Sequence, residues 1–313
     1  MTEKLVLCLS AVLPLLLVVA VGYAAKRAGL IREQDVPRAN KWAFTVFMPL
    51  MCFYNIYTSD LSSAIRPRLI VFTIGAIFAV YALSVLFAAR AVKRRESRSA
   101  VIQGLFRSNY VILGLPLAAG LTNDGDIGVA AVLGAVVVPI FNALAVVTLE
   151  TYRGEKPDGK KLLLDILRNP LILGSVAGIL FLALGIRLPE IIEKPVRDLG
   201  KAASPLMLFL LGAFFNFRIS GGARAYLSAV CLGRLLVIPA LTLSCALLFG
   251  FRGIELISLL AVFASPTAVA SFTMAEQMGA DAELAGNIVI STSFLSAFTL
   301  FAWSFLLKML NFI

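Results

Sequence analysis

The chain has 313 residues, of which 60% are hydrophobic and only 15% are charged. Soluble domains carry about a quarter charged residues, so this composition excludes an ordinary water-soluble fold and indicates a protein that uses lipid as its solvent. The absence of histidine excludes histidine-ligated zinc sites and Ser-His or Cys-His nucleophiles, and the net charge of +10 comes from basic residues in short loops, which is typical of a membrane orientation signal rather than of nucleic-acid binding.

Ten apolar segments are long enough to cross a bilayer, because a spanning helix needs about 20 mostly apolar residues. These segments cover residues 5–25, 36–57, 69–89, 99–120, 127–149, 162–184, 199–217, 225–249, 255–278 and 284–310. The first segment could instead be a cleaved signal peptide, since Lys4 precedes it. Its length and the basic Lys26 and Arg27 that follow it favour a span.

Lys and Arg residues are divided unequally between alternate loops. With the N-terminus outside, 17 of them lie in the inside loops and nine lie on the outside. Because cytoplasmic loops carry an excess of basic residues, the sequence predicts a multi-pass protein of the cell inner (plasma) membrane with both termini outside.

The longest polar interruption divides the ten segments five and five. We therefore predict a first five-helix repeat over residues 1–150, a short cytoplasmic linker over 151–161 and a second repeat over 162–313. Both halves contain two glycines and a proline at spacings of 7 and 20 positions, namely Gly22, Gly29 and Pro49 in the first and Gly178, Gly185 and Pro205 in the second. An odd number of spans per half would place the second repeat upside down in the membrane, as in many secondary transporters.

The predicted fourth and ninth spans each contain a proline near the middle. Pro116 follows Gly114 in the fourth span, and Pro266 precedes Thr267 in the ninth. Proline removes a backbone donor, so each of these residues could break its helix or merely kink it. If both helices are broken, the partially positive N-terminal ends of two half-helices converge near the midplane from opposite faces, and such a place favours an anion.

The polar residues within the spans also favour an anion over a cation. All 18 acidic residues lie in loops or near span ends, with Glu276 the deepest, whereas proton relays and cation sites usually need a carboxylate at mid-membrane. Arg107 in the fourth span and Arg234 in the eighth could each attract an anion, snorkel to a headgroup or pair within the bundle. Asn109 offers a neutral amide to a ligand or to an interhelical hydrogen bond.

Residues 107–117 resemble the Asn-x-x-x-x-Gly-x-Pro-Leu signature of the auxin efflux carrier family, which includes plant PIN-type carriers and bacterial permeases for malonate and malate. Similar motifs occur along nearly the whole chain, at residues 22–30, 168–170, 204–206 and 266–268. Unlike many plant carriers, this chain has only a short loop between its halves, so control by phosphorylation of a long loop is not predicted.

The resemblance implies an all-α membrane protein with a bile-acid-symporter-like fold. In that fold, ten transmembrane helices form two inverted five-helix repeats, and a scaffold domain carries a transport domain whose fourth and ninth helices are broken and cross. Transport would follow an elevator-like movement. In plant relatives the crossing prolines and the signature asparagine contribute to carboxylate binding, and the resemblance transfers this role to Pro116, Pro266 and Asn109.

We therefore predict a secondary transporter, or permease, of small organic anions, either mono- or dicarboxylates, rather than an enzyme. The predicted substrate-binding residues are Asn109, Gly114, Pro116, Pro266, Thr267 and Arg107. The expected partners are the substrate anion and the lipid bilayer, with a homodimer as a further option, and no nucleic acid, metal or cofactor is expected. An anion channel or a transporter-derived membrane sensor is the alternative, and flux measurements would separate these from a carrier.

Overall fold

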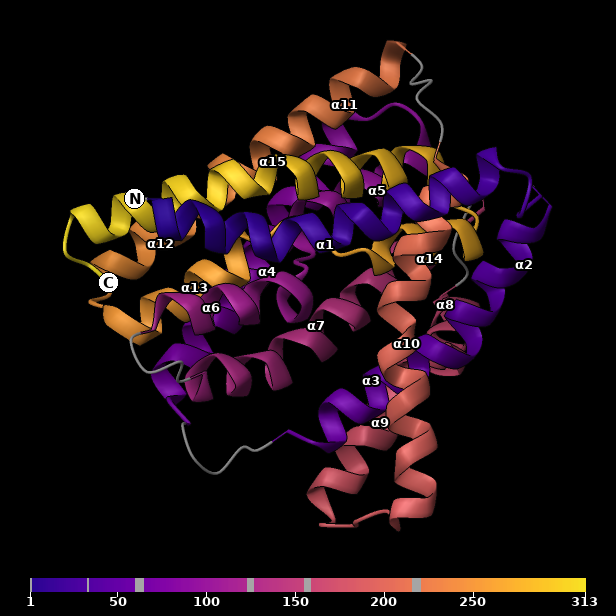
Figure 1. The fold of residues 1–313 in the computed structure, drawn as a ribbon, viewed down its shortest axis with the longest axis horizontal. Coiled ribbons are helices and arrows are strands. Elements are labelled where there is room, and N and C mark those ends of the chain that lie inside the picture. The colour runs from indigo at the N-terminus through magenta and orange to yellow at the C-terminus, as the bar shows by residue number, and fades with distance from the viewer. Residues whose placement is uncertain (1, 33, 60–64, 123–126, 155–158, 216–220) are drawn as a thin grey trace.

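The computed structural model describes residues 2–32, 34–59, 65–122, 127–154, 159–215 and 221–313. Within these ranges every regular element is a helix, and the one β contact is an isolated antiparallel bridge between Ser108 and Thr267 (Figure 1). The predicted all-helical fold class is therefore confirmed. The predicted linker, residues 151–161, lies partly outside the described residues.

The helices follow the apolar segments of the sequence closely. The elements are α1 (Thr2–Arg27), α2 (Asp35–Trp42), η1 (Ala43–Phe47), α3 (Met48–Tyr57), α4 (Pro67–Ala91), α5 (Arg95–Phe106), η2 (Tyr110–Gly114), α6 (Leu115–Leu121), α7 (Gly128–Tyr152), α8 (Gly159–Arg168), α9 (Pro170–Ala183), α10 (Glu190–Phe214), α11 (Gly221–Leu232), η3 (Gly233–Val237), α12 (Ile238–Leu248), α13 (Gly253–Ala264), α14 (Ala270–Gln277) and α15 (Ala282–Met309). Each predicted segment overlaps one helix or a consecutive run of these elements, although α10 begins at Glu190, well before the segment predicted over residues 199–217.

Fewer helices qualify as membrane spans than the sequence predicts. By length and composition, four described helices could cross a membrane: α4, α7, the run Ala223–Leu248 through α11, η3 and α12, and α15. The number rises to five if α8 and α9, which meet at 59°, form one span. Interruptions reduce other segments to short apolar helices, such as Tyr110–Leu121 and Gly253–Ala264.

Three helical runs contain a π-helical turn, and each turn ends two residues before a proline. The turns η1, η2 and η3 end at Phe47, Gly114 and Val237, ahead of Pro49, Pro116 and Pro239. In each case the residue before the proline donates its N–H to the carbonyl at the start of the π turn. Proline cannot donate, and its ring collides with the preceding turn of an α-helix, so a wider turn at this point lets the helix continue.

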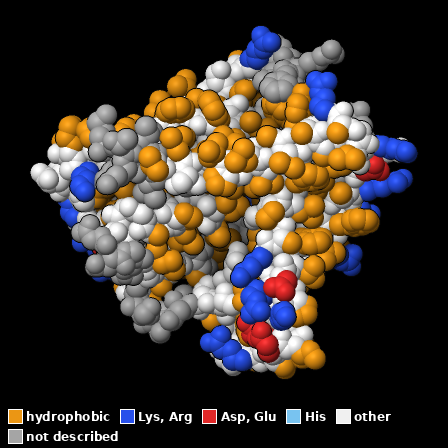
Figure 2. Space-filling view, viewed as in Figure 1, with side chains coloured by type: hydrophobic (Ala, Val, Ile, Leu, Met, Phe, Trp, Pro, Cys, Tyr) orange, Lys and Arg blue, Asp and Glu red, His pale blue; other side chains and the backbone are white. Residues whose placement is uncertain are grey.

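The surface in Figure 2 separates apolar from charged regions. Hydrophobic side chains cover most of this face, while acidic and basic side chains gather at the lower end, where α10 begins in Figure 1. At that end Arg197 lies 3.3 Å from Glu190 and 3.7 Å from Asp198. An extended apolar face with charged side chains at its margins suits a surface in contact with lipid.

Glycines let two pairs of helices approach backbone to backbone. A Cβ on Gly22 in α1 would overlap the carbonyl oxygen of Phe209 in α10, and a Cβ on Gly178 in α9 would lie 2.8 Å from the carbonyl oxygen of Phe53 in α3. One sequence offset relates the two contacts, because 178 − 22 and 209 − 53 both equal 156. Small residues of this kind are the usual means by which membrane helices pack closely.

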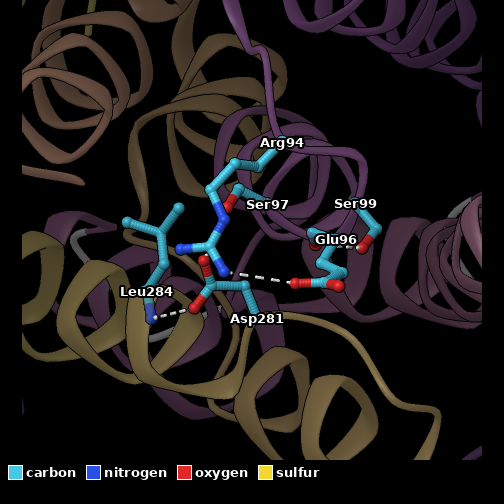
Figure 3. A network of polar contacts seen from close by, with 6 residues as sticks. All are labelled: Arg94, Glu96, Ser97, Ser99, Asp281 and Leu284. Atoms are coloured by element: carbon cyan, nitrogen blue, oxygen red, sulfur yellow. Dashed lines mark hydrogen bonds and ion pairs between the residues drawn. The ribbon is translucent and has the colours of Figure 1, made fainter. Parts of the chain in front are cut away.

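A polar network joins the start of α15 to the start of α5 (Figure 3). Asp281 caps α15 by accepting the Leu284 N–H at 3.0 Å, and its second carboxylate oxygen accepts the Ser97 hydroxyl at 2.6 Å. On the same turn, Glu96 forms an ion pair with Arg94 at 3.4 Å. An acidic N-cap also complements the partial positive charge of a helix N-terminus, so this network fixes where α5 enters the bundle.

Candidate functional site

Two interrupted helical runs cross at their breaks. The chain leaves α5 at Phe106 and resumes at Tyr110, while the other run leaves α13 at Ala264 and resumes at Ala270. Between these points the two segments pair as short extended strands. The Asn109 N–H donates to the carbonyl of Pro266 at 2.8 Å, and the Ala268 N–H donates to the carbonyl of Arg107 at 3.2 Å. Each break thus satisfies backbone groups of the other, which lipid could not do.

The break in the first run does not lie at Pro116, so the alternative in which Pro116 breaks its helix is wrong. Pro116 lies in the first turn of α6, directly after η2, and the run from Tyr110 to Leu121 is one continuous helix. The π turn supplies the space that the proline ring needs, so no interruption is required there. In the second run, by contrast, Pro266 lies within the break, as predicted.

Arg234 holds the two breaks together from one side. Its fully buried guanidinium donates to the carbonyls of Leu105 at 3.1 Å, Val262 at 3.1 Å and Ser265 at 2.8 Å. These carbonyls belong to the C-terminal ends of α5 and α13. Each helix C-terminus carries roughly half a negative charge, so the two ends together offset the charge of one guanidinium. The sequence left three roles open for Arg234, and the structure supports pairing within the bundle, with backbone carbonyls as the partners.

Arg107 has a different environment, although it is also buried. Its Nη2 donates to Oδ1 of Asn142 at 2.6 Å, and its Nη1 contacts Oε1 of Gln103 at 3.3 Å and the sulfur of Met274 at 2.8 Å. All three are neutral groups. Among the residues that the structure describes, Arg107 forms no ion pair. Its positive charge is therefore solvated by dipoles but not neutralised.

A cavity of about 70 Å³ lies beside Arg107. The first residues of both resumed helices contribute to its wall, together with side chains of α3, α7 and α10. Its lining residues are Met51, Asn55, Arg107, Ser108, Asn109, Tyr110, Val111, Ile112, Val138, Phe141, Asn142, Ser204, Met207, Ala268, Val269 and Ala270. Two further hydrogen-bonding groups here, Nδ2 of Asn109 and Oγ of Ser108, are buried without a partner within the described chain.

Of the predicted site residues, only Arg107 and Asn109 line this cavity. Thr267 does not line the cavity, and its hydroxyl donates to the carbonyl of Gly104 at 2.8 Å. Gly114 faces α13, where a Cβ would lie 2.8 Å from the carbonyl oxygen of Ala261. With Pro266, whose carbonyl accepts the Asn109 N–H, these residues form the crossing rather than the cavity wall.

Glu276, the acidic residue that the sequence places deepest within a span, lies away from the cavity. Glu276, near the C-terminal end of α14, accepts a hydrogen bond from Nδ2 of Asn40 at 2.6 Å and another from the Gln277 amide. Asn40 also donates to the carbonyl of Thr273 at 3.2 Å. Neither Glu276 nor Asn40 belongs to the cavity lining.

Sequence reasoning missed most of the polar cavity wall. Asn142, Asn55 and Ser204 lie on α7, α3 and α10, and none of these side chains was predicted to belong to the site, although residues 204–206 form one of the family motifs. Their polarity was the available signal, because amides and hydroxyls in spans make interhelical hydrogen bonds or line cavities. Their convergence on one cavity depends on tertiary packing.

A family model described as "Membrane transport protein" matches residues 7–304. The chain belongs to the membrane transport protein family. This is the family of the auxin efflux carriers, so the resemblance based on residues 107–117 is confirmed. Membership identifies a transporter family rather than an enzyme family, and the apolar helices are those of a multi-pass membrane protein.

Two relatives of this membrane transport protein match it over nearly their full length. An uncharacterized transporter of Methanothermobacter thermautotrophicus is 26% identical over 301 residues, which cover 95% of this chain and 97% of the relative. An uncharacterized transporter of Methanocaldococcus jannaschii is 24% identical over 303 residues, with the same coverage of 95% and 97%.

Proposed function

We propose that this membrane transport protein is a secondary transporter of small organic anions, either mono- or dicarboxylates, and that the anion binds in the cavity beside Arg107. The observation that carries the proposal is a buried guanidinium that meets only neutral acceptors within the described chain. Burying a charge without a counter-ion costs several kcal/mol. A bound carboxylate offsets that cost through charge-assisted hydrogen bonds, for which the planar guanidinium is well suited.

The helix ends around the cavity support the same ligand charge. Arg234 already offsets the negative C-terminal ends of α5 and α13. Among the described residues, no ion pair involves the N-terminal ends of η2 and α14, and Val111 and Val269 from these ends line the cavity. The first N–H groups of a helix lack intrahelical acceptors and favour anions.

We further propose that the chain forms ten transmembrane helices in two inverted repeats, in the cell inner membrane with both termini outside, and works by an elevator-like movement. The close contacts of Gly22 and Gly178, repeated at one sequence offset, support the repeats. The composition of the cavity wall supports the movement. Asn55 and Ser204 lie on α3 and α10, opposite the crossing that supplies Arg107, so sliding of one group of helices against the other would open the cavity to alternate sides.

Counterflow in proteoliposomes tests this function. Purified protein should exchange radiolabelled carboxylates saturably and should discriminate against an amine or a neutral sugar of equal size. Arg107→Gln should lose most of the exchange, while Arg107→Lys, which keeps the charge but not the planar fork, should keep part of it. Preferential transport of an organic cation would contradict the proposal, and currents far above the turnover of a carrier would indicate a channel instead.

A further inference from the structure

A long apolar groove separates α4 from α12 and is distinct from the cavity at the crossing. It encloses about 580 Å³, which is within the usual range for ligand pockets. Its lining residues are Val71, Phe72, Gly75, Ala76, Ala79, Val80, Leu83, Ser84, Phe87, Leu105, Gly233, Val237, Ile238, Leu241, Thr242, Cys245 and Phe249. The two hydroxyls donate back to their own helices, Ser84 to Val80 and Thr242 to Ile238, so they offer no donor to a polar ligand.

The shape of the groove fits an extended hydrocarbon chain. Its α4 wall runs from Val71 to Phe87 and its opposite wall from Gly233 to Phe249, 16 positions in each case (87 − 71 and 249 − 233). At 1.5 Å per residue each wall is about 24 Å long. The groove is open at Gly75, where a Cβ would meet nothing within 4 Å.

One end of the groove carries two arginines. Arg68 lies one turn before Phe72 on α4 and donates to the carbonyl of Phe249, which lines the groove. Arg252 donates to the carbonyls of Leu247 at 3.0 Å and Phe251 at 2.7 Å, around the same end of α12. Both arginines are exposed, and neither forms an ion pair among the described residues.

These guanidiniums keep free donors for an anion. A guanidinium has five N–H groups, and the hydrogen bonds of Arg68 and Arg252 to these carbonyls use one nitrogen of each. Each guanidinium also lies over an aromatic ring, Arg68 over Phe251 at 5.2 Å and Arg252 over Phe312 at 4.8 Å, and such a contact engages the face of the guanidinium rather than its N–H groups. Unpaired arginines at helix ends lie where headgroups begin, and guanidinium binds phosphate oxygens through paired, charge-assisted hydrogen bonds. The groove therefore combines an apolar slot with a phosphate-binding end.

We propose that this groove binds a phospholipid with an anionic headgroup, with one acyl chain along α4 and α12 and the phosphate beside Arg68 and Arg252. The site is separate from the proposed substrate cavity. The two guanidiniums should favour an anionic headgroup over a zwitterionic one, because a zwitterionic headgroup also carries a cation that the guanidiniums repel.

Native mass spectrometry of the detergent-purified full chain tests the proposal. With phosphatidylglycerol and phosphatidylcholine of identical acyl chains in equal amounts, the protein should retain one phosphatidylglycerol at least tenfold more than phosphatidylcholine. The double variant Arg68→Gln, Arg252→Gln should lose this preference. Arg90→Gln, which removes a basic residue from the other end of α4, is the matched control and should keep it.

A second pair of variants tests the acyl slot. Gly75→Phe fills the groove and should abolish retention of the lipid, while Ala82→Phe, on an exposed position of α4 outside the groove, should not. In the wild-type protein, phosphatidylglycerol should also shield Cys245, an exposed thiol in the groove, from a lipid-soluble maleimide. Equal retention of both lipids, displacement by palmitate at equal concentration, or a dimer that Gly75→Phe dissociates would each overturn the proposal.

Discussion

The backbone N–H of Asn109 donates to the carbonyl oxygen of Pro266 at 2.8 Å, and this bond joins two helical runs at the points where each is interrupted. Around it, the buried residues fall into two groups. Arg234 and Thr267 bind carbonyls of the broken helices and hold the crossing together. Arg107 and Asn109 line the cavity, and the described residues leave the charge of Arg107 and the amide nitrogen of Asn109 without a partner. The two groups should respond differently to substitution.

Arg107→Gln should weaken anion binding without weakening the fold. A hydrogen bond to a charged group contributes about 1.5–3 kcal/mol, so the dissociation constant for a transported carboxylate should rise roughly tenfold or more. The thermal midpoint should change little, because the lost hydrogen bonds to Asn142 and Gln103 are offset by removal of a buried charge for which the described residues supply no counter-ion. Isothermal titration calorimetry and thermal unfolding on the same preparation measure both quantities. An unchanged dissociation constant would show that Arg107 is not the charge partner.

Asn109→Ala should also lower affinity by roughly tenfold, because a desolvated ligand oxygen would lose one hydrogen bond. Nδ2 of Asn109 is buried without a partner in the described chain, so its removal breaks no bond within the protein. We therefore expect the free energy of unfolding to change by less than about 1 kcal/mol. If Asn109 were only a packing residue, expression or stability would fall while the binding isotherm of the surviving protein stayed the same.

Arg234→Met should show the opposite pattern. The carbonyls of Leu105, Val262 and Ser265 would lose their buried donor, and disrupting a buried charged network costs about 3–5 kcal/mol. Arg224→Met serves as the control, because this arginine is exposed on α11 and its loss should change stability by less than about 0.5 kcal/mol. Denaturation in a single detergent compares the two. Equal stability of both variants would remove the structural role assigned to Arg234.

The sequence predicted the helical segments well because their cause is local. A run of about 20 apolar residues has few alternatives to a helix in lipid, and the segment predicted over residues 69–89 corresponds to α4, Pro67–Ala91. A break was likewise one of the two alternatives at Pro266, because proline removes a backbone donor, and the structure has the break there.

Features that depend on distant partners could not be predicted. The first break lies at Arg107–Asn109 rather than at Pro116 because the segment pairs with Thr267, which is far away in the chain. Arg234 carries no sign in the sequence that its acceptors are carbonyls of two other helices. The cavity contribution of Asn142 likewise follows from how α7 packs beside the crossing.

Gly22→Ala and Gly75→Ala make a matched pair that tests the close helix contacts. A Cβ on Gly22 would overlap the carbonyl oxygen of Phe209, so α1 and α10 would have to separate, at a cost of about 1–3 kcal/mol. A Cβ on Gly75 would meet nothing within 4 Å, and alanine is about 1 kcal/mol better than glycine within a helix. Thermal unfolding should therefore shift in opposite directions. A stabilising Gly22→Ala would contradict the contact.

Single cysteines in a background without Cys8, Cys52, Cys231 and Cys245 can test the orientation, which rests on the excess of 17 over nine basic residues in alternate loops. Ser97, which sequence alone placed in a loop, is a poor reporter because it is buried and bonded to Asp281. Lys93, exposed after α4, and Glu190, whose side chain is 71% exposed at the start of α10, are suitable positions on opposite predicted sides.

With both termini outside, Lys93→Cys faces the cytoplasm and Glu190→Cys faces the exterior. An impermeant maleimide should therefore label Glu190→Cys in intact cells and should label Lys93→Cys only after permeabilisation. The two sites control for each other, because a reagent that leaks into cells would label both before permeabilisation. The reverse pattern would invert the topology. Labelling of both sites from outside, with a reagent shown not to enter, would place them on the same side and would contradict the three crossings predicted between them over residues 99–120, 127–149 and 162–184.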